Sequence, residues 1–452
     1  MELSHCSLIS NLFEYLDIDY AKQQKCKQKA IILHDIVKLI KYSSENDGKE
    51  TERKKMPLIQ LHPKLTQICE ELQKSSAQVY VAGGMVRDAL LGFSSKDIDL
   101  EVHGIDQQKL LNILKRFVHI KEVGKSFEVC KFNIEEKEID ISVSDASTVK
   151  EACRRRDLRI NSILYDPLTD QIVDPFDGIN DIKNKMLTAT DPVFFQEDPL
   201  RVLRVAQFSG RFNFQICTTL RELCLSLDLS HLPPDRVLTE INKSWLKSPK
   251  PSIAFREFHT LQIIPKYIKS WSGLEKPEVL ESLDRGKHYC TENNGWNMAL
   301  FWGLALQKCT PTEAEEILEQ FTVHDFLKYK IRAAVFASLQ SSEKLALEES
   351  SILRNHAAEN FHLNFLCAVS MSIWPNGFGK TNLEKAVLQG MECSALPRII
   401  QGRDILPFGL KGQEIGNCLS HIRQLELNEQ LQNKSQGLEA IQQWITSKKA
   451  TQ

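Results

Sequence analysis

Strand-forming sequence is confined to one stretch of this chain, and this restriction limits the possible folds more than any other feature. Short alternating runs of apolar and polar residues occur at 79–82, 98–102, 129–134 and 139–143, separated by helical patterns. From Asp191 onward apolar residues recur at helical spacing, with breaks at prolines and glycines. We therefore expect an α+β head with a mixed sheet, followed by a long all-α region.

Composition excludes several classes of protein. Twelve cysteines are scattered without a CxxC pair, which argues against a zinc cluster or a disulfide framework and favours free thiols in a reducing cytoplasm. No apolar run approaches the roughly 20 residues that span a bilayer, so we expect no membrane segment. The net charge is −2, so any RNA site must come from a local basic patch.

Two glycines, Gly83 and Gly84, stand between the first strand pattern and an apolar helical pattern. Glycines in this position allow backbone N–H groups to face an anion at the start of the helix. Because Gly-Gly turns are common, this signal alone is weak.

Acidic residues occupy one face of two predicted strands. Asp97 and Asp99 alternate with apolar residues, so both side chains point to the same side of the strand. Asp140 stands alone between Ile139 and Ile141 on a later strand. Neighbouring carboxylates repel unless a cation lies between them, and Mg²⁺ accepts one or two carboxylates together with nucleotide phosphates. A solvated acidic strand face, or the DxD motif of a sugar transferase, would give a similar pattern.

Further blocks identify a family that the chain resembles. The motifs are GG-x-VRD with DxD, an RRD-x-x-IN block, a DPFDG segment and an EDxxR block. Together they resemble the class II CCA-adding enzymes and the bacterial poly(A) polymerases. The matching segments are Gly83–Asp88, Asp97–Asp99, Arg155–Asn161, Asp174–Gly178 and Glu197–Arg201.

This resemblance implies a polymerase-β-like nucleotidyltransferase that adds C and A from CTP and ATP to the 3′ end of tRNA. Asp97, Asp99 and Asp140 would be the catalytic carboxylates, with Asp97 and Asp99 holding two Mg²⁺ ions. The partner would be the acceptor stem of tRNA, recognised by its shape and phosphates. The nucleotide-binding residues implied by the motifs are Gly83, Gly84, Arg87, Arg156, Asp157, Asn161, Asp198, Arg201 and Arg204.

Asp198 and Arg201 are spaced to read a nucleobase. Lying three residues apart, they would share one face of a helix that begins near Glu197 and runs to about Phe212. Cytosine and adenine both present an amine donor beside an unprotonated ring nitrogen, whereas uracil and guanine present a carbonyl beside an N–H. A carboxylate beside a guanidinium therefore accepts C and A and opposes G and U. An ordinary salt bridge would have the same spacing.

Residues 1–56 lie outside the resemblance and are set apart by the charged stretch at 43–55, whereas the resemblance implies the organisation of the rest of the chain. We expect an N-terminal helical extension and charged linker, a catalytic head, a neck that recognises the base, a body, and a tail that binds tRNA. Their bounds are 1–56, 57–190, 191–270, 271–395 and 396–452.

One departure from the family pattern keeps other functions open. Only sixteen residues separate Asp140 from Asp157, whereas relatives that add the full CCA usually have a longer flexible loop there. The short connection resembles that of enzymes that add only CC. A poly(A) polymerase and a catalytically inert RNA-binding homologue are further alternatives.

Overall fold

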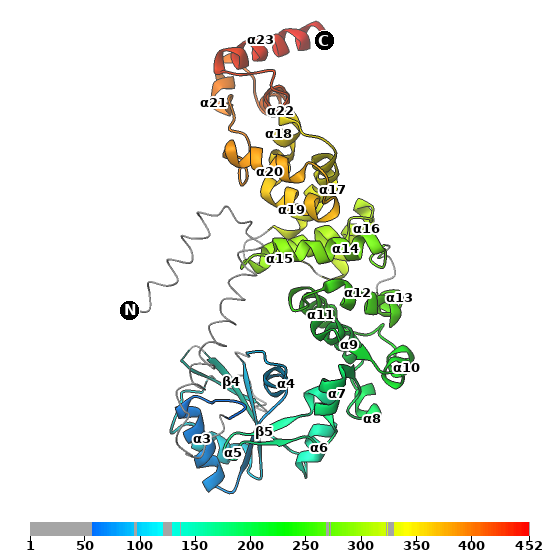
Figure 1. The fold of residues 1–452 in the computed structure, drawn as a ribbon. Coiled ribbons are helices and arrows are strands. Elements are labelled where there is room, and N and C mark those ends of the chain that lie inside the picture. The colour runs from blue at the N-terminus through cyan, green and yellow to red at the C-terminus, as the bar shows by residue number, and fades with distance from the viewer. Residues whose placement is uncertain are drawn as a thin grey trace, which may run out of the picture. The chain divides into compact units, whose positions relative to one another are not determined.

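The computed structural model describes residues 57–94, 97–120, 129–135, 137–267, 271, 273–321, 323 and 330–451. The predicted extension at 1–56 lies outside these residues. Figure 1 shows the fold from the N-terminal head to the C-terminal helix α23 (Lys434–Thr451).

The head is built on a mixed six-stranded sheet with the strand order β3-β4-β2-β1-β5-β6. β2 and β4 are parallel, and the other neighbours are antiparallel. The strands are β1 (Gln78–Val81), β2 (Ile98–His103), β3 (Val129–Ile134), β4 (Lys137–Val143), β5 (Leu164–Asp166) and β6 (Gln171–Val173). The predicted strands are therefore confirmed, as is the mixed sheet.

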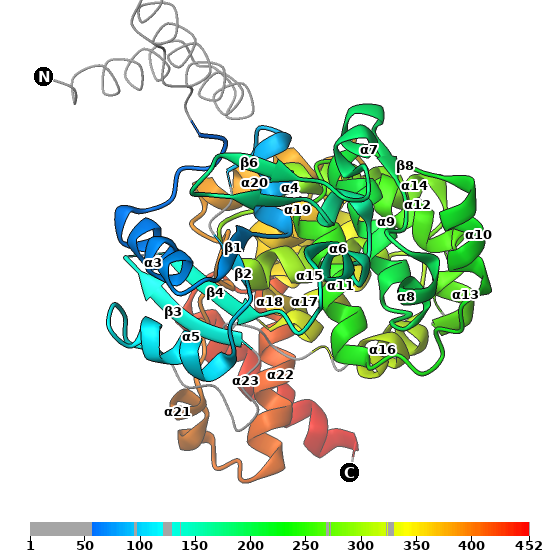
Figure 2. The same cartoon turned by 90° about the horizontal axis from the view of Figure 1, so that it is seen from below.

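One face of this sheet is covered by two helices, α3 (Pro63–Lys74) and α5 (Gln107–Leu114), which lie side by side in Figures 1 and 2. Alternate residues of β2, such as Leu100 and Val102, are buried in the cluster that contains both helices. Because side chains alternate along a strand, Asp99 and Glu101 point to the opposite face. The hydrophobic pattern of the strands thus determines on which side their acidic groups lie.

Helices connect and follow the sheet. In the head these are α4 (Gly84–Leu90), α6 (Val149–Arg154) and α7 (Gly178–Asn184). A small parallel pair, β7 (Met186–Leu187) and β8 (Gln215–Ile216), joins the head to the helical region. Beyond β8 every regular element that the structure describes is helical, as predicted.

The helical region begins with α8 (Pro192–Gln196) and α9 (Arg201–Phe212). It continues with α10 (Thr218–Ser226), α11 (Pro234–Leu246), α12 (Pro251–Thr260), α13 (Ile263–Tyr267), α14 (Pro277–Gly286), α15 (Asn294–Ala305), α16 (Pro311–Gln320), α17 (Ile331–Leu347), α18 (Ser351–Asn360), α19 (Leu363–Ile373) and α20 (Gly379–Leu388). Last come α21 (Gly402–Ile405), α22 (Gln413–Leu427) and α23. Several of these helices start at a proline, which suits the first turn because its missing N–H needs no partner there.

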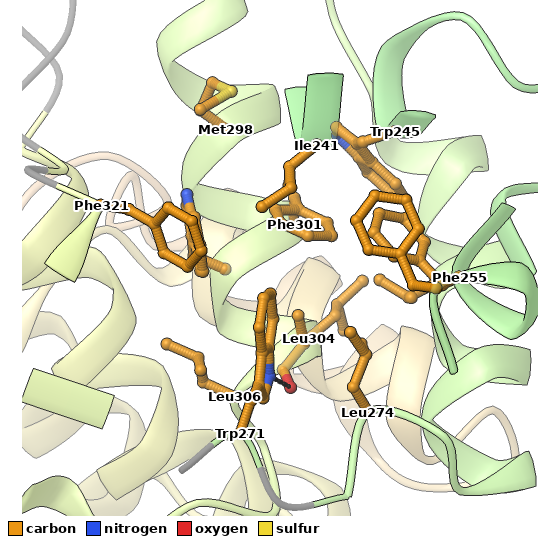
Figure 3. Packing of buried hydrophobic residues seen from close by; sticks show 14 of the residues in the cluster. Ile241, Trp245, Phe255, Trp271, Leu274, Met298, Phe301, Leu304, Leu306 and Phe321 are labelled. Carbon is orange, nitrogen blue, oxygen red and sulfur yellow. Dashed lines mark hydrogen bonds between the residues drawn. The ribbon is translucent and has the colours of Figure 1, made fainter. Parts of the chain in front are cut away.

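Aromatic side chains form the centre of the helical region (Figure 3). The rings of Trp271 and Trp302 stack with centroids 5.4 Å apart, and Phe301 lies 5.7 Å from Trp245. The indole N–H of Trp271 donates to the carbonyl of Ala305, so its polar edge is satisfied inside the core. The same hydrophobic cluster extends from 158 to 391, so the proposed boundary at 270 lies within one continuous core.

Candidate active site

The glycine turn brings the backbone close to two charged side chains. Gly83 has φ 65° and ψ −129°, a conformation that is nearly restricted to glycine. A Cβ atom placed there would lie 3.3 Å from Nη1 of Arg156 and 3.7 Å from Oδ2 of Asp99. The backbone of the turn therefore lies close to both a cation and a carboxylate, and a side chain at Gly83 would crowd Arg156.

A Gly83→Ala substitution is expected to lower the free energy of unfolding by about 1–3 kcal/mol, because the backbone conformation would become strained. Equilibrium unfolding in urea, followed by circular dichroism, measures this loss. Gly416→Ala in α22 is the matched control, since nothing lies within 4 Å of its added Cβ. Equal stability of the two variants would show that the left-handed turn is not required.

The carboxylates of β2 and β4 lie on adjacent strands. Asp99 is directly opposite Asp140 in the parallel pairing. Burial raises the pKa of Asp99, and the neighbouring Asp140 raises it further, although Arg156 opposes both effects. The raised pKa thus reflects first the removal of this carboxylate from water and then the second carboxylate beside it.

Lys131 on β3 partly compensates this charge. Its ammonium group donates to Oδ2 of Asp140, which it faces across the antiparallel strand pair. Oδ1 of Asp140 is buried and has no hydrogen-bond partner among the described residues. Asp140 therefore keeps one buried oxygen available to a further donor or a cation.

The donor set of this site fits a magnesium ion that is shared with a substrate. Within the described part of the chain, no three His, Cys, Asp or Glu side chains form a group that could hold a metal ion by themselves. Mg²⁺ commonly takes only one or two carboxylates and completes its octahedron with water and phosphate oxygens. Asp99 with its raised pKa, together with Asp97, suits that role.

A cavity of about 440 Å³ lies beside Asp99. All nine residues that the sequence predicted to bind the nucleotide line it together with Asp99. Asp97 and Asp140 do not line it. Two lining residues, Leu200 and Arg236, were not among the predicted site residues. The structure thus brings together residues from positions 83 to 236, while the role of each remains a prediction.

A buried network holds the floor of this cavity. Arg87 donates to Asn161, whose amide donates to Oδ1 of Asp157 at 2.9 Å. Oδ2 of Asp157 accepts from Arg204 at 2.8 Å. Burial raises the pKa of Asp157, but Arg204 and the hydrogen bonds outweigh this effect, so its pKa is lowered overall. Asp157 is therefore an ionised carboxylate fixed in one orientation.

Arg87 is itself held on three sides. Its guanidinium pairs with Asp88 at 2.7 Å and lies over the rings of Phe208 and Phe212, at 5.0 and 4.9 Å from their centroids. Asp88 also accepts from Arg211 at 2.8 Å. The arginine is only 3% exposed, so the network links the glycine turn rigidly to α9.

The predicted helix position of Asp198 is wrong. α9 begins at Arg201, and Asp198 lies in the turn before it, where its Oδ1 accepts the backbone N–H of Leu200 at 3.2 Å. The first N–H groups of a helix have no partner within the helix, and here the carboxylate supplies one. Asp198 and Arg201 nevertheless both line the cavity.

Asp198 and Arg201 also do not form the ordinary salt bridge that their spacing allows. Oδ2 of Asp198 accepts from Arg236 of α11 at 2.9 Å. Arg201 donates to the carbonyls of Phe194 and Arg155, at 2.6 and 2.8 Å. Each group is thus fixed by a third partner, and a guanidinium with five N–H donors retains some for a ligand.

Two functional candidates were missed by the sequence reading. Glu101 accepts hydrogen bonds from Arg156 and from His103, and so anchors Arg156 beside Gly83. Glu101 continues the alternation of Asp97 and Asp99, which could have indicated it. Arg236 bonds to Asp198 from 38 positions away, a separation at which local sequence patterns give no signal.

The DPFDG segment has a structural role. Asp174 accepts the backbone N–H groups of Gly178 and Ile179, at 2.8 and 2.9 Å, at the start of α7. A Cβ on Gly178 would lie 2.2 Å from the carbonyl oxygen of Arg159. The segment thereby fixes the Arg159–Asn161 turn that presents Asn161 to the cavity.

Part of the chain is similar in sequence to known proteins. Residues 79–188 match the family described as the Poly A polymerase head domain. The Multifunctional CCA protein of Tolumonas auensis is 32% identical over 238 residues, which are 47% of this chain and 56% of that protein. The chain thus spans about half the length of this curated relative. No helix among the described residues is long and apolar enough to cross a membrane.

Solved structures resemble the chain over most of its length. A CCA-adding enzyme in complex with ATP superposes with a TM-score of 0.65 and 21% identity, covering 85% of this chain and 96% of the other. The Thermotoga maritima CCA-adding enzyme complexed with tRNA gives a TM-score of 0.59 at 21% identity, with the same coverage. Residues 79–188 therefore match the poly A polymerase head family, and the chain has, over most of its length, the fold of the CCA-adding enzymes.

Proposed function

We propose that this protein is a tRNA nucleotidyltransferase that adds C and A from CTP and ATP to the 3′ end of tRNA without a nucleic-acid template. The observation that supports this most strongly is one cavity lined by Asp99, by the Gly83–Gly84 turn and by both Asp198 and Arg201. A carboxylate for metal binding, a turn for phosphates and a polar pair for the base thus lie within reach of one nucleotide. The relatives named above bind ATP or tRNA, which supports the same substrates.

Asp97 and Asp99 would hold Mg²⁺, and we propose that two Mg²⁺ ions bind at this site. When bound, Mg²⁺ lowers the pKa of the attacking 3′-hydroxyl and stabilises the pyrophosphate that leaves. Asp140 would complete the catalytic carboxylates, since its buried Oδ1 has no partner in the described structure. Lys131 would keep Asp140 in place by holding its other oxygen.

The triphosphate would lie along the glycine turn. Arg156 approaches Gly83 and is anchored by Glu101, so we assign it to the phosphates in preference to base recognition. Asn161 would contact the triphosphate as well. Asp157, ionised and fixed by Arg204, is the candidate acceptor for a ribose hydroxyl.

The base would be selected by Asp198 and Arg201. Asp198 accepts the exocyclic amine of cytosine or adenine, and Arg201 donates to the unprotonated ring nitrogen. Their anchoring by Arg236 and by two backbone carbonyls keeps both groups in place before the nucleotide binds. Uracil and guanine would leave polar groups unpaired, at a cost of about 1–3 kcal/mol for each group.

The remaining assignments follow the same proposal. Residues 57–190 would be the catalytic head, 191–270 the neck, 271–395 the body, and 396–452 the tail that binds the tRNA acceptor stem. We also propose a cytoplasmic location, because tRNA is the substrate and the ten cysteines that the structure describes are free thiols.

Incubation of the purified protein with tRNA lacking its 3′ end, Mg²⁺ and labelled CTP or ATP tests the proposal. We expect CMP incorporation with CTP alone and completion by AMP when both nucleotides are present. Addition that stops after CC would instead favour an enzyme that adds only CC. The short connection between Asp140 and Asp157 is the feature that supports this alternative. Long A tails would indicate a poly(A) polymerase. Binding of tRNA without any incorporation of nucleotides would indicate an inert RNA-binding homologue.

A further inference from the structure

An aromatic side chain is exposed next to the metal-binding strand. Phe93 follows α4 and precedes Asp97 by four positions, and it is 54% exposed. Its backbone N–H donates to the carbonyl of Asp88 at 2.8 Å, and Gly92 before it adopts a left-handed turn with φ 78°. An exposed phenylalanine is thus held in a defined position, four residues before the proposed metal ligand Asp97.

The inner face of Phe93 rests on a rigid stack. Its ring lies 6.3 Å from that of Phe212 at an interplanar angle of 28°, and Phe212 lies 5.9 Å from Phe208 at 6°. Arg87 and Arg211 lie over the ring of Phe212, at 4.9 and 4.8 Å from its centroid. Because the ring of Phe93 rests on this stack, the exposed face of Phe93 is a preformed surface for another flat group.

Positive charge accumulates at the same place. Burial lowers the pKa of Lys247, and the nearby Arg211 and Lys243 lower it further, while Asp97 and Asp88 oppose this effect. Arg211 lies over the ring of Phe212, on which Phe93 stacks, so its guanidinium belongs to the same aromatic stack. A phosphate of a strand that stacks on Phe93 is a suitable partner for this cation.

This surface lies outside the nucleotide cavity. Phe93, Arg211 and Lys247 are not among the residues that line the cavity, and neither is Asp97. The incoming nucleotide would occupy the cavity, so the second substrate must approach Asp97 and Asp99 from elsewhere. Phe93 precedes Asp97 by four residues, and its stacking partner Phe212 lies against Arg87, which lines the cavity.

We propose that the 3′-terminal base of the acceptor RNA stacks on the exposed face of Phe93, while Arg211 receives a phosphate of the same strand. This inference rests on the proposed function. The terminal base of the acceptor changes after every addition, so hydrogen bonds specific for one base would fail at the next step. Stacking tolerates every base because each has a π-face.

Phe93→Ala in the full-length protein tests the platform with two acceptors, one with a normal 3′-terminal nucleotide and one with an abasic 3′-terminal nucleotide. Stacking on one aromatic ring predicts that KM for the normal acceptor rises by on the order of tenfold, with KM for CTP unchanged. The abasic acceptor should lose affinity for the wild type and show no further loss with Phe93→Ala. Phe93→Trp should restore the KM for the normal acceptor.

Phe378→Ala is the matched control, because Phe378 is 45% exposed and far from the site in sequence. It should leave both KM values unchanged. A wild-type KM for the acceptor in Phe93→Ala, or a rise in KM for CTP instead, overturns the platform while leaving the proposed function intact. Absence of incorporation by the wild-type protein would reject the proposed function itself.

Discussion

Asp99→Asn is expected to reduce nucleotide incorporation by roughly a thousandfold or more without lowering the melting temperature. Metal-ion catalysis contributes several kcal/mol to the stabilisation of the transition state, and each 1.4 kcal/mol corresponds to a factor of ten. Burial and Asp140 raise the pKa of Asp99, so its charged form is unfavourable in the folded protein. The substitution removes that charge and keeps the shape of the side chain. Single-turnover incorporation and differential scanning calorimetry measure the two effects.

The raised pKa of Asp99 gives the expected pH dependence a definite sign. The folded protein binds the proton of this carboxyl more tightly than the unfolded chain does, so stability falls as pH rises from the ordinary pKa through the raised one. At neutral pH, Mg²⁺ should therefore raise the melting temperature of the wild type. It should raise the melting temperature of Asp99→Asn much less.

An exposed carboxylate in the loop between α10 and α11 provides the control for this experiment. Asp228→Asn removes an exposed carboxylate whose partners are the nearby Ser230 and His231, and should retain full activity. Full activity of Asp99→Asn would contradict the assignment of Asp99 to metal binding.

The sheet and its acidic face could be predicted because the signal is local. Apolar residues at every second position of 98–102 and 139–143 determine both the strands and the side on which Asp99 and Asp140 lie. That these two aspartates are direct neighbours depends on the parallel register of β2 and β4, which the sequence does not specify. Lys131 faces Asp140 because β3 pairs with β4 in this register, and this contact was not predicted either.

The start of α9 was predicted wrongly because the spacing of two residues in the sequence does not show which group a carboxylate will bond to. Asp198 and Arg201 have the spacing of helix neighbours, yet the unpaired N–H of Leu200 competes for the carboxylate and becomes its partner. The second partner, Arg236, comes from α11 through the packing of α9 against α11. Contacts of this kind arise from tertiary structure, so local periodicity cannot reveal them.

Asp198→Asn is expected to lower the incorporation of CMP and AMP by about 10- to 100-fold, and to weaken the selection of C over U. The carboxylate can only accept hydrogen bonds, whereas an asparagine amide can also donate to the carbonyl of uracil. Loss of one buried polar pairing costs about 1–3 kcal/mol, which gives this range. Competition between labelled CTP and UTP measures the selectivity directly.

Arg236→Ala separates base recognition from the positioning of Asp198. This variant keeps the carboxylate but removes the ion pair that holds its Oδ2. It should lower the incorporation of CMP and AMP equally, by roughly fivefold for an exposed pair, and leave the selection of C over U unchanged. If Asp198→Asn also retained that selection, the base would have to be read elsewhere, because an amide and a carboxylate cannot present the same hydrogen-bonding edge to both pyrimidines.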